Sequence, residues 1–334
     1  MKKTIALLLA ALMLLCLAAC SNGKDAIQPN GPAQGRIQVD DGVVFRVGIV
    51  QLVQHEALDR ATQGFMDALA EELGTDHLEI DLQNASGDIP TCSTIVNTFV
   101  SNDVDLILAN ATPALVAAAN ATSEIPVLGT SITDYATALE IDNFNGTVGG
   151  NVSGTSDLAP LDEQAEMVLE FAPDAERVGI LYCSAEPNSV YQADQVEAYL
   201  TKQGVEVERY TFTDSSDVGG VTATACSQCG AIYIPTDNTA AACGEAIHNA
   251  SAGSGVPIIS GEENACRLFG VATLSIDYYK IGQIAGQMAA KILVGEADIS
   301  AMPIEFDSEP VRMYNPAICE ELGITPPEGY QAIE

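Results

Sequence analysis

A strand-and-helix pattern that occurs twice constrains the fold of this chain more than any other feature of its sequence. A β-branched run at residues 46–50 leads into a helical spacing of apolar residues, and a similar run at 177–181 does the same. The two runs begin 131 residues apart, and the same separation lies between Pro126 and Pro257, each of which stands in a short apolar run. The sequence therefore predicts two similar halves.

Each half alternates short strands with helical segments of about 12 to 16 residues, which is typical of parallel sheets with helices on both faces. We therefore expect an α/β fold with two doubly wound parallel-sheet lobes. The first lobe is predicted at residues 43–153 plus 278–300 and the second at 154–277 plus 301–334, with crossings near 151–155, 274–275 and 301–302. The predicted strands lie at 45–52, 78–84, 105–109, 127–130, 177–182, 206–211, 231–235, 257–260 and 271–275, followed by a helix at 278–293 and short strands near 304 and 311.

The N-terminus resembles that of a bacterial lipoprotein precursor. An apolar run at residues 5–19 follows two lysines, and its 15 residues fall short of the roughly 20 that span a bilayer. Residues 17–20 (LAAC) are similar to a lipobox, whose cysteine becomes the lipidated first residue of the mature chain. We expect a signal peptide at 1–19, lipidation of Cys20 and a flexible linker at 20–42, which would leave the protein lipid-anchored on the extracytoplasmic side of the cell membrane. An ordinary signal peptide or a short membrane anchor is the alternative.

The charge balance excludes nucleic acid as a partner. The chain has 13 basic and 46 acidic side chains, for a formal net charge of −33. Binding of a phosphate backbone requires clustered Lys and Arg, and an acidic surface repels it.

The seven cysteines that follow Cys20 predict neither a disulfide framework nor a metal centre. Their number is odd and their spacing is scattered. Cys226 and Cys229 form a C-x-x-C pair, but no second pair or nearby histidine completes a zinc site. We expect buried or free thiols, no metal and no cofactor.

Polar side chains follow the predicted strands in both halves. Ligands of parallel sheets bind beyond the carboxyl ends of the strands, close to helix N-termini. None of the basic residues after Cys20 stands at such a position, so we expect hydroxyl and helix N–H groups to hold an anion and a carboxylate such as Asp237 or Glu262 to pair with an ammonium. This set favours a small zwitterion. The candidates are Gln51, His55, Asn84, Thr112, Thr130, Ser131 and Asp134 in the first half, and Asn188, Ser189, Thr213, Thr236, Asp237, Asn238, Glu262 and Glu263 in the second.

Each of these candidates also has a structural explanation. Thr112 and Asp237 are typical helix caps, because Thr and Asp satisfy the free N–H groups of a first turn. Glu262 with Glu263 is also typical of a solvated acidic pair, and His55 of a surface residue. Capping and ligand contact therefore both stay open here. An enzyme is disfavoured, because no serine-hydrolase elbow, phosphate-binding loop or zinc-protease motif occurs.

A series of short motifs extends over nearly the whole chain after the linker. They are VGIVQ at 47–51 with His55, ATPA at 111–114, IPV at 125–127, NVSGTSD at 151–157, EPNS at 186–189, IPTDNT at 234–239, GEE at 261–263 and IDYY at 276–279. In their order and gaps these motifs resemble a family of ABC transporter substrate-binding lipoproteins that includes tryptophan- and tyrosine-binding members. Glu56 and the Cys226–Cys229 pair depart from the usual family pattern.

This resemblance implies a type I periplasmic-binding-protein fold, in which two α/β lobes joined by three crossings close on a ligand in the cleft between them. It carries ligand contact onto Thr112, Ser131, Asn188, Ser189, Asp237, Asn238 and Glu262. It implies a monomeric binding protein without enzymatic activity, whose partners are an amino acid, aromatic in particular, and an ABC permease with its ATPase. A lipoprotein that senses a ligand for a membrane sensor is the alternative, and a hydrolase on the same scaffold is a weaker third.

Overall fold

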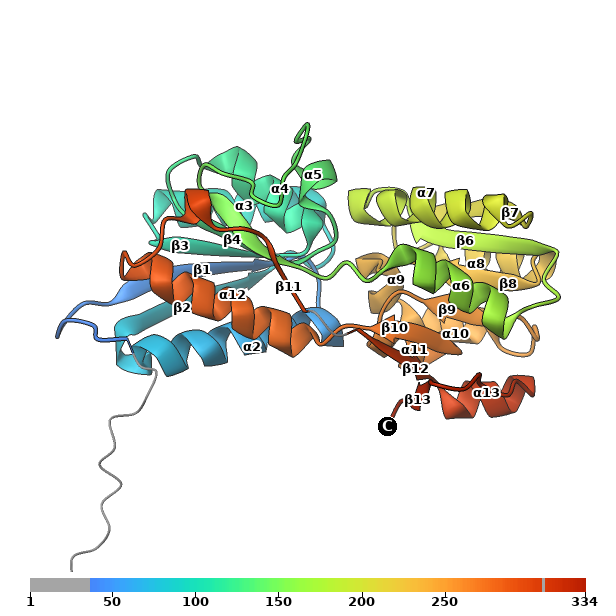
Figure 1. The fold of residues 1–334 in the computed structure, drawn as a ribbon. Coiled ribbons are helices and arrows are strands. Elements are labelled where there is room, and N and C mark those ends of the chain that lie inside the picture. Colours follow the sequence, from blue (N-terminus) through green and yellow to red (C-terminus); the bar gives the residue numbers. More distant parts are fainter. Residues whose placement is uncertain (1–36, 308–309) are drawn as a thin grey trace, which may run out of the picture. The chain divides into compact units, whose positions relative to one another are not determined.

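The computed structural model describes residues 37–307 and 310–334, which belong to one compact unit from residue 37 to 334 (Figure 1). The predicted signal peptide, Cys20 and most of the predicted linker lie outside the described residues. The packed chain begins before residue 43, where the first lobe is predicted to start, because Ile37 N donates to Glu72 O at 3.0 Å and Val39 packs against the adjoining core. None of the helices in the described ranges combines the length and apolar character that a membrane crossing requires.

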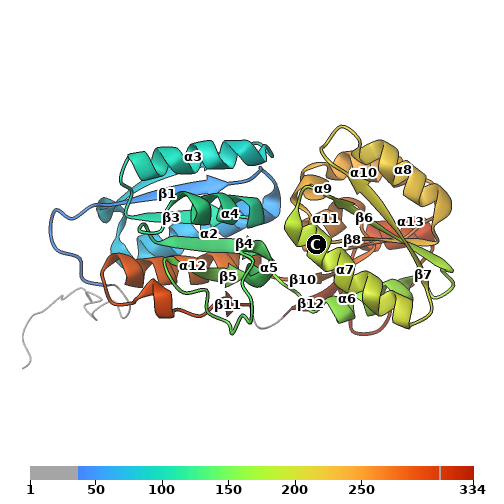
Figure 2. The ribbon, with the colours of Figure 1, turned by 90° about the horizontal axis from the view of Figure 1, so that it is seen from above.

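The first sheet has six strands, all parallel, in the order β11-β5-β4-β3-β1-β2. Along β3, Ile107 faces one layer of helices and Leu108 the other, so both faces of the sheet are buried. Helices α3 and α4 cover one face, and α2 and α12 cover the other (Figure 2). The elements are β1 (Phe45–Gln51), α2 (Glu56–Leu73), η1 (Thr75–His77), β2 (Leu78–Asn84), α3 (Ile89–Ser101), β3 (Leu106–Asn110), α4 (Thr112–Ala121), β4 (Val127–Ile132), α5 (Tyr135–Ala138), β5 (Val152–Ser156), α12 (Tyr278–Leu293), η2 (Ile299–Ala301) and β11 (Glu305–Phe306).

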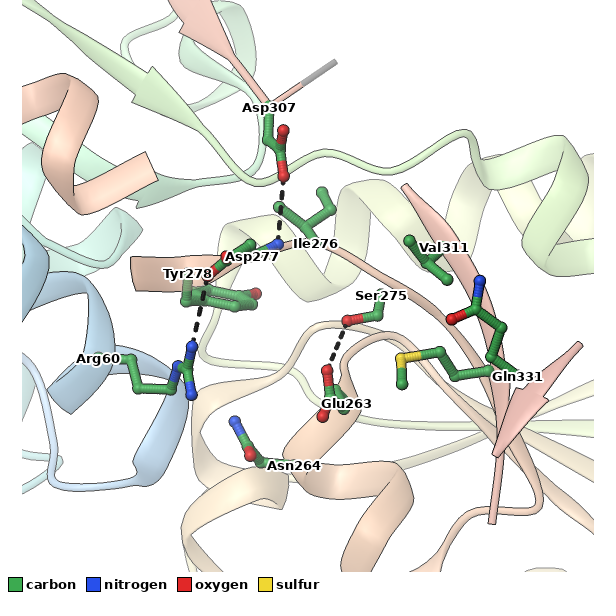
Figure 3. A pocket seen from close by; sticks show the side chains of 11 residues that line it. Arg60, Glu263, Asn264, Ser275, Ile276, Asp277, Tyr278, Asp307, Val311 and Gln331 are labelled. Carbon is green, nitrogen blue, oxygen red and sulfur yellow. Dashed lines mark hydrogen bonds and ion pairs between the residues drawn. The ribbon is translucent and has the colours of Figure 1, made fainter. Parts of the chain in front are cut away.

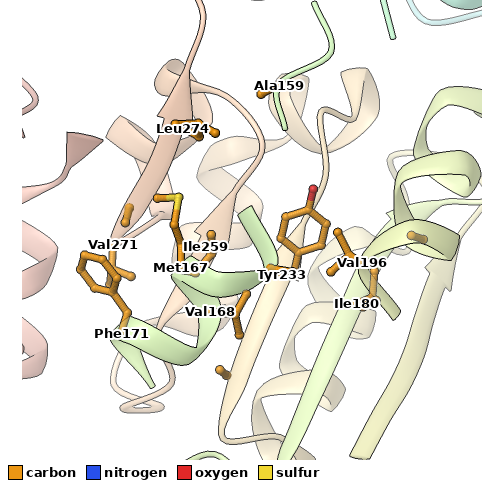
Figure 4. Close-up of a cluster of buried hydrophobic side chains, with 14 of the residues drawn as sticks. Ala159, Met167, Val168, Phe171, Ile180, Val196, Tyr233, Ile259, Val271 and Leu274 are labelled. Carbon is orange, nitrogen blue, oxygen red and sulfur yellow. The ribbon is translucent and has the colours of Figure 1, made fainter. Parts of the chain in front are cut away.

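The second sheet has seven strands in the order β13-β12-β10-β9-β8-β6-β7, and only the β10–β12 pair is antiparallel. Val168 of α6 and Val196 of α7 lie with Tyr233 on one face, as Figure 4 shows, while Ile247 of α10 packs with Ile232 on the other. The elements are α6 (Leu161–Phe171), β6 (Arg177–Cys183), α7 (Pro187–Lys202), β7 (Glu206–Phe212), α8 (Val218–Gln228), β8 (Ala231–Ile234), α9 (Asn238–Ala242), α10 (Gly244–Ser251), β9 (Ile258–Ser260), α11 (Glu263–Phe269), β10 (Ala272–Ser275), β12 (Val311–Tyr314), α13 (Pro316–Leu322) and β13 (Gln331–Ala332). We call each sheet with its helices a lobe.

The predicted α/β fold with two mostly parallel sheets is confirmed, and each predicted strand ends within two residues of an observed one. The predicted crossings differ from the observed ones, since residues 274–275 belong to β10 and residues 301–302 lie at the end of η2. Residues 151–155 are predicted as a crossing, whereas most of them form β5, a buried strand of the first sheet, and β11 pairs with it there. Small residues let this strand approach β4 closely, since a Cβ on Gly154 would collide with the backbone of Gly129.

The predicted lobe boundary after residue 153 thus falls inside β5. The chain leaves the first sheet after Ser156, returns to it through α12 after Ser275, and leaves again between β11 and β12. The predicted boundary between residues 300 and 301 also lies too early, because β11 still pairs with β5 in the first sheet.

Helices α2 and α12 lie side by side (Figure 1) and touch through glycines, which provides a direct test of the first-lobe packing. A Cβ on Gly282 would collide with the carbonyl oxygen of Ala61. We expect Gly282→Ala to lower the free energy of unfolding by roughly 1–3 kcal/mol, measured by urea denaturation, because the backbones would have to separate. Gly220→Ala in α8, where a Cβ meets open space, is the control and should raise stability by up to about 1 kcal/mol. Equal denaturation midpoints for the two variants would contradict this packing.

Candidate functional site

The carboxyl edges of the two sheets face one another. The loop after β1 meets the start of α9, where His55 Nε2 lies 3.2 Å from Asn238 Oδ1. Farther along, Arg267 of α11 forms an ion pair with Glu56 of α2, with 3.4 Å between nitrogen and oxygen. Helix α7 of the second lobe approaches α4 and α5 of the first. Some of the candidate residues at the strand ends, His55 and Asn238 among them, therefore lie between the lobes.

A cavity of about 340 Å³ lies between these edges, a volume at the small end of ligand sites. A second pocket of about 310 Å³ adjoins His55, Glu262 and Arg267. The first cavity is lined by Leu52, Val53, Ser86, Gly87 and Ile89 of the first lobe, and by Cys183, Ala185, Glu186, Thr213, Asp214, Ser215, Thr239, Ala242 and Cys243 of the second.

The first lobe presents a strained backbone and an unsatisfied hydroxyl at the ends of β3 and β4. Ala111 and Ser131 have φ angles of 93° and 57°, which non-glycine residues rarely adopt and which cost about 1–3 kcal/mol each. Ser131 Oγ is buried without a partner among the described residues. Thr112 begins α4, whose N-terminus has no side-chain cap, and Ala111 N donates to Thr130 O, which brings this helix end beside Ser131. Such strain and free donors are typical of ligand sites.

Two other first-lobe candidates make internal hydrogen bonds. Gln51 donates to Val53 O and Asp59 Oδ1 and accepts from Thr62 Oγ1, at 2.7–2.9 Å. Thr130 accepts a hydrogen bond from Thr155 Oγ1 at 3.1 Å. These contacts hold the loop after β1 and the β4–β5 pair, and a role of Gln51 or Thr130 in ligand contact stays a prediction.

Buried carboxylates cap two helices of the second lobe. Asp237 Oδ1 accepts from Ala240 N of α9 at 2.8 Å, and its Oδ2 accepts from Cys183 N at 2.7 Å. Glu262 accepts from two N–H groups of the first turn of α11. The capping role predicted for Asp237 is therefore observed. Burial raises the pKa of Glu262 to about 7, and burial beside Glu186 raises the pKa of Asp237.

Glu186 is a third buried carboxylate and a residue that the sequence analysis did not select. Its oxygens accept from the backbone N–H groups of Asn238 and Thr239 at 3.1 and 2.9 Å, and from both side chains. Two carboxylates, Glu186 and Asp237, therefore accept hydrogen bonds from the N–H groups at the start of α9. The position of Glu186 in the EPNS motif was the available signal, since it immediately precedes the candidates Asn188 and Ser189.

Asn188 at the start of α7 offers an unsatisfied acceptor. Its Nδ2 donates to Thr236 O at 3.0 Å and lies 3.4 Å from Glu186 Oε2, which fixes the orientation of the amide. Its Oδ1 is buried and has no partner among the described residues. The neighbouring Ser189 is fully buried and bonds to Asp237. Helix α7, like α4, has no side-chain cap.

His55 and Asn238 join the two lobes. Burial of the His55 ring lowers its pKa, so the neutral imidazole is favoured. Its Nδ1 has no partner within the described part of the chain. Asn238 Nδ2 donates to Glu186 Oε2 at 2.6 Å, so that the contact with His55 connects the first lobe to the capping carboxylates.

The other candidates have structural partners. Asn84 accepts from Ser86 N in a turn, Asp134 caps α5, and Glu263 pairs with Arg267. Thr213 lines the cavity, and Thr236 O accepts from Asn188. A further residue that the sequence analysis missed, Asn110 at the end of β3, is fully buried with an unpartnered Oδ1 among the described residues.

The thiols do not form a metal site with other side chains. Cys229 Sγ lies 3.5 Å from the Tyr210 hydroxyl, and both Cys226 and Cys229 are buried. Over residues 37–307 and 310–334, no group of three or more His, Cys, Asp and Glu side chains is arranged to hold a metal ion. Of the seven cysteines in these ranges, only Cys243 is partly exposed.

A buried hydrogen-bond network ties the crossings together. Asp157, just after β5, accepts from the Tyr278 hydroxyl at 2.8 Å and from Thr133 Oγ1 at 3.2 Å. Burial raises the pKa of Asp157 to about 6. A pocket of about 250 Å³ beside the crossings is drawn in Figure 3, where Arg60 reaches Asp277 at 3.5 Å.

Comparison with protein families and curated proteins gives matches along nearly the whole described chain. The model of a family described as ABC transporter substrate binding protein matches residues 46–332. A tyrosine-binding protein of Clostridioides difficile (strain R20291) is 34% identical over 301 residues, which cover 89% of this chain and 85% of that protein.

Solved structures match to different extents. An ABC domain in complex with L-Trp from Streptococcus pneumonia is 32% identical, with a TM-score of 0.82, over 87% of this chain and 100% of that one. A conserved domain protein from Vibrio cholerae is 28% identical with the same TM-score and coverage. A ligand-free, open substrate-binding protein with adhesive properties from Clostridium difficile is 34% identical with a TM-score of 0.66, over 87% and 99% of the two chains.

The buried Asp157 predicts a pH dependence of stability. Its pKa in the folded protein, about 6, exceeds the unfolded value of about 3.9, so between these values the folded state binds more protons and stability falls as pH rises. We expect Asp157→Asn to remove this loss, which is on the order of 2–3 kcal/mol between pH 4 and 7, in denaturation curves recorded across that range. The exposed Asp162→Asn is the control and should keep the wild-type pH dependence. Parallel pH profiles for wild type and Asp157→Asn would refute the assignment.

Proposed function

We propose that this chain, which belongs to the family of ABC transporter substrate-binding proteins, holds an amino acid between its two lobes and delivers it to a membrane permease. The observation that carries the proposal is the pair of unsatisfied buried groups on opposite lobes, Ser131 Oγ and Asn188 Oδ1. A ligand that satisfies both must contact both lobes, and a ligand stabilises a closed arrangement only through such contacts.

The carboxylate of the ligand is assigned to the first lobe. An uncapped helix N-terminus presents free N–H groups and a positive dipole, and α4 has such an end beside Ser131 Oγ. The helices α9 and α11 do not offer this, because Asp237, Glu186 and Glu262 already accept from their first turns. Helix α7 also lacks a side-chain cap, but it begins directly after Glu186. A second carboxylate there would lie among like charges.

The ammonium is assigned to the second lobe for the same electrostatic reason. Asn188 Oδ1 is an acceptor without a donor among the described residues, and Glu186 lies 3.4 Å from the amide nitrogen of the same side chain. An ammonium that donates to Asn188 would lie near Glu186 and would favour the charged form of Asp237, whose pKa burial raises, without displacing the N–H donors of either carboxylate. In this assignment Asp237 and Glu262 act on the ligand mainly through their charge and through the helices they cap.

The relatives support an aromatic amino acid as the ligand. A tyrosine-binding protein and a structure bound to L-Trp are similar to this chain at 34% and 32% identity. The fold of this chain is more similar to the L-Trp complex, with a TM-score of 0.82, than to the structure described as ligand-free and open, with a TM-score of 0.66. The sequence identities show the opposite order, 32% and 34%. The difference in TM-score is expected if the lobes of such proteins move on binding.

A test of the site removes the Ser131 hydroxyl. We expect Ser131→Ala to weaken binding of L-tryptophan or L-tyrosine by about tenfold to a hundredfold in isothermal titration calorimetry, because a hydrogen bond to a charged group contributes about 1.5–3 kcal/mol. Thermal stability without ligand should not change, since Oγ has no partner to lose. Ser101→Ala on the surface of α3 is the control and should bind as wild type does. If the wild-type protein binds no amino acid, the proposed function fails; unchanged affinity in Ser131→Ala rejects only the role of Ser131.

The proposed location rests on the lipobox-like residues 17–20. We expect metabolic labelling with palmitate to mark the wild-type protein and not Cys20→Ser, which should also leave the membrane fraction. Cys226→Ser, a thiol replaced in the folded part, should keep the label. Labelling of Cys20→Ser at the wild-type level would contradict lipidation at this residue.

A further inference from the structure

The cavity of about 340 Å³ between the lobes has largely apolar walls, unlike the polar groups of the proposed site. We propose that this cavity receives the side chain of the bound amino acid, and that Ile89 and Cys243, which line it from opposite lobes, determine the size of the side chain that the protein accepts. This inference rests on the proposed function.

The cavity adjoins both ends of the proposed polar site. On the second lobe, Glu186 lines the cavity and lies beside the Asn188 amide that is assigned to the ammonium. On the first lobe, Leu52 lines the cavity, and its N–H donates to Asn110 O at 3.2 Å, two residues before Thr112. We therefore place the side chain of a zwitterion held between Ser131 and Asn188 in this cavity.

The lining suits an uncharged side chain. Leu52, Val53 and Ile89 supply apolar surface from the first lobe, and two cysteines and two alanines supply it from the second. No Lys, Arg or His stands among the lining residues, so an acidic side chain would be buried without a partner. The two acids of the wall are already engaged, Glu186 by the start of α9 and Asp214 by Ser216.

Ile89 and Cys243 are apolar lining residues that pack at the edges of the two cores and stay partly exposed. Ile89 begins α3 and Cys243 follows α9, and both are partly buried. Leu52 and Cys183, by contrast, belong to the cores of the two lobes, with exposures of 3% and 2%. A larger residue at Cys243 therefore narrows the cavity.

Because its walls come from both lobes, the cavity couples side-chain size to lobe closure. A side chain that fills it contacts Ile89 and Cys243 together and favours the closed arrangement, whereas a methyl group leaves the two walls apart. We therefore expect the affinity for aromatic amino acids to depend on this cavity and the affinity for L-alanine to be independent of it.

Two experiments test the assignment. In calorimetry, Cys243→Phe should weaken binding of L-tryptophan at least about tenfold and leave L-alanine binding within about threefold of wild type, since a misfit in an apolar pocket typically costs tenfold or more. Ser227→Phe on the exposed face of α8 is the control, because the neighbouring Cys226 is buried and a larger residue there would disturb the core. The Ser227→Phe variant should bind both amino acids as wild type does.

The second experiment needs no variant of the cavity. Iodoacetamide at mildly alkaline pH should alkylate Cys243 in the native protein before the other cysteines of the folded part, because those are buried. Saturating L-tryptophan should slow the alkylation of Cys243 at least about tenfold, because the bound ligand would cover its side chain. Failure of the wild-type protein to bind any amino acid rejects the proposed function itself. Binding of L-tryptophan without protection of Cys243 overturns the side-chain assignment alone, as does an unchanged affinity in a folded Cys243→Phe variant.

Discussion

The protein satisfies some of its helix N-termini with its own carboxylates and leaves others free, and the proposed binding mode depends on this difference. Helices α9 and α11 of the second lobe begin at buried acids, Asp237 with Glu186 and Glu262, whose oxygens accept from first-turn N–H groups. Helices α4 and α7 have no side-chain cap. Of these two ends with free donors, α4 lies beside the unpartnered Ser131 Oγ, whereas α7 begins directly after Glu186. In the proposed site the anion therefore lies on the first lobe, and an acceptor, Asn188 Oδ1, lies on the second.

The same buried acids explain how a strongly acidic chain can bind a zwitterion without a basic residue. The first lobe places Ser131 Oγ and the start of α4 at a strained turn, so the donors are backbone and hydroxyl groups. The second lobe supplies negative charge next to Asn188. The crossings lie to one side of this arrangement, where Asp157 and Tyr278 share a buried hydrogen bond that connects two of them. Movement of the lobes would therefore turn about a polar hinge.

Much of this could be predicted from the sequence, because the fold follows from local patterns. Apolar β-branched runs marked the strands of both sheets, and the rule that ligands bind at strand ends led to Ser131 and Asn188. Contacts between residues that are far apart in the sequence cannot be predicted from such local patterns. Asp237 caps α9 through Ala240, three residues away, but its other oxygen accepts from Cys183, 54 residues away. The role of Glu186 depends on Asn238, 52 residues away. The small residues of β5 lack the apolar pattern of a strand, so a crossing is predicted there. Their burial comes instead from close packing against Gly129 of β4.

A crystal structure of the protein with L-tryptophan bound would show which lobe holds each charged group of the ligand. We expect the ligand carboxylate within hydrogen-bond distance of Ser131 Oγ and the first turn of α4, and the ammonium at Asn188 Oδ1. A ligand in the reverse orientation, with its carboxylate at the start of α9 or α11, or a ligand bound away from the facing strand ends, would contradict this binding mode.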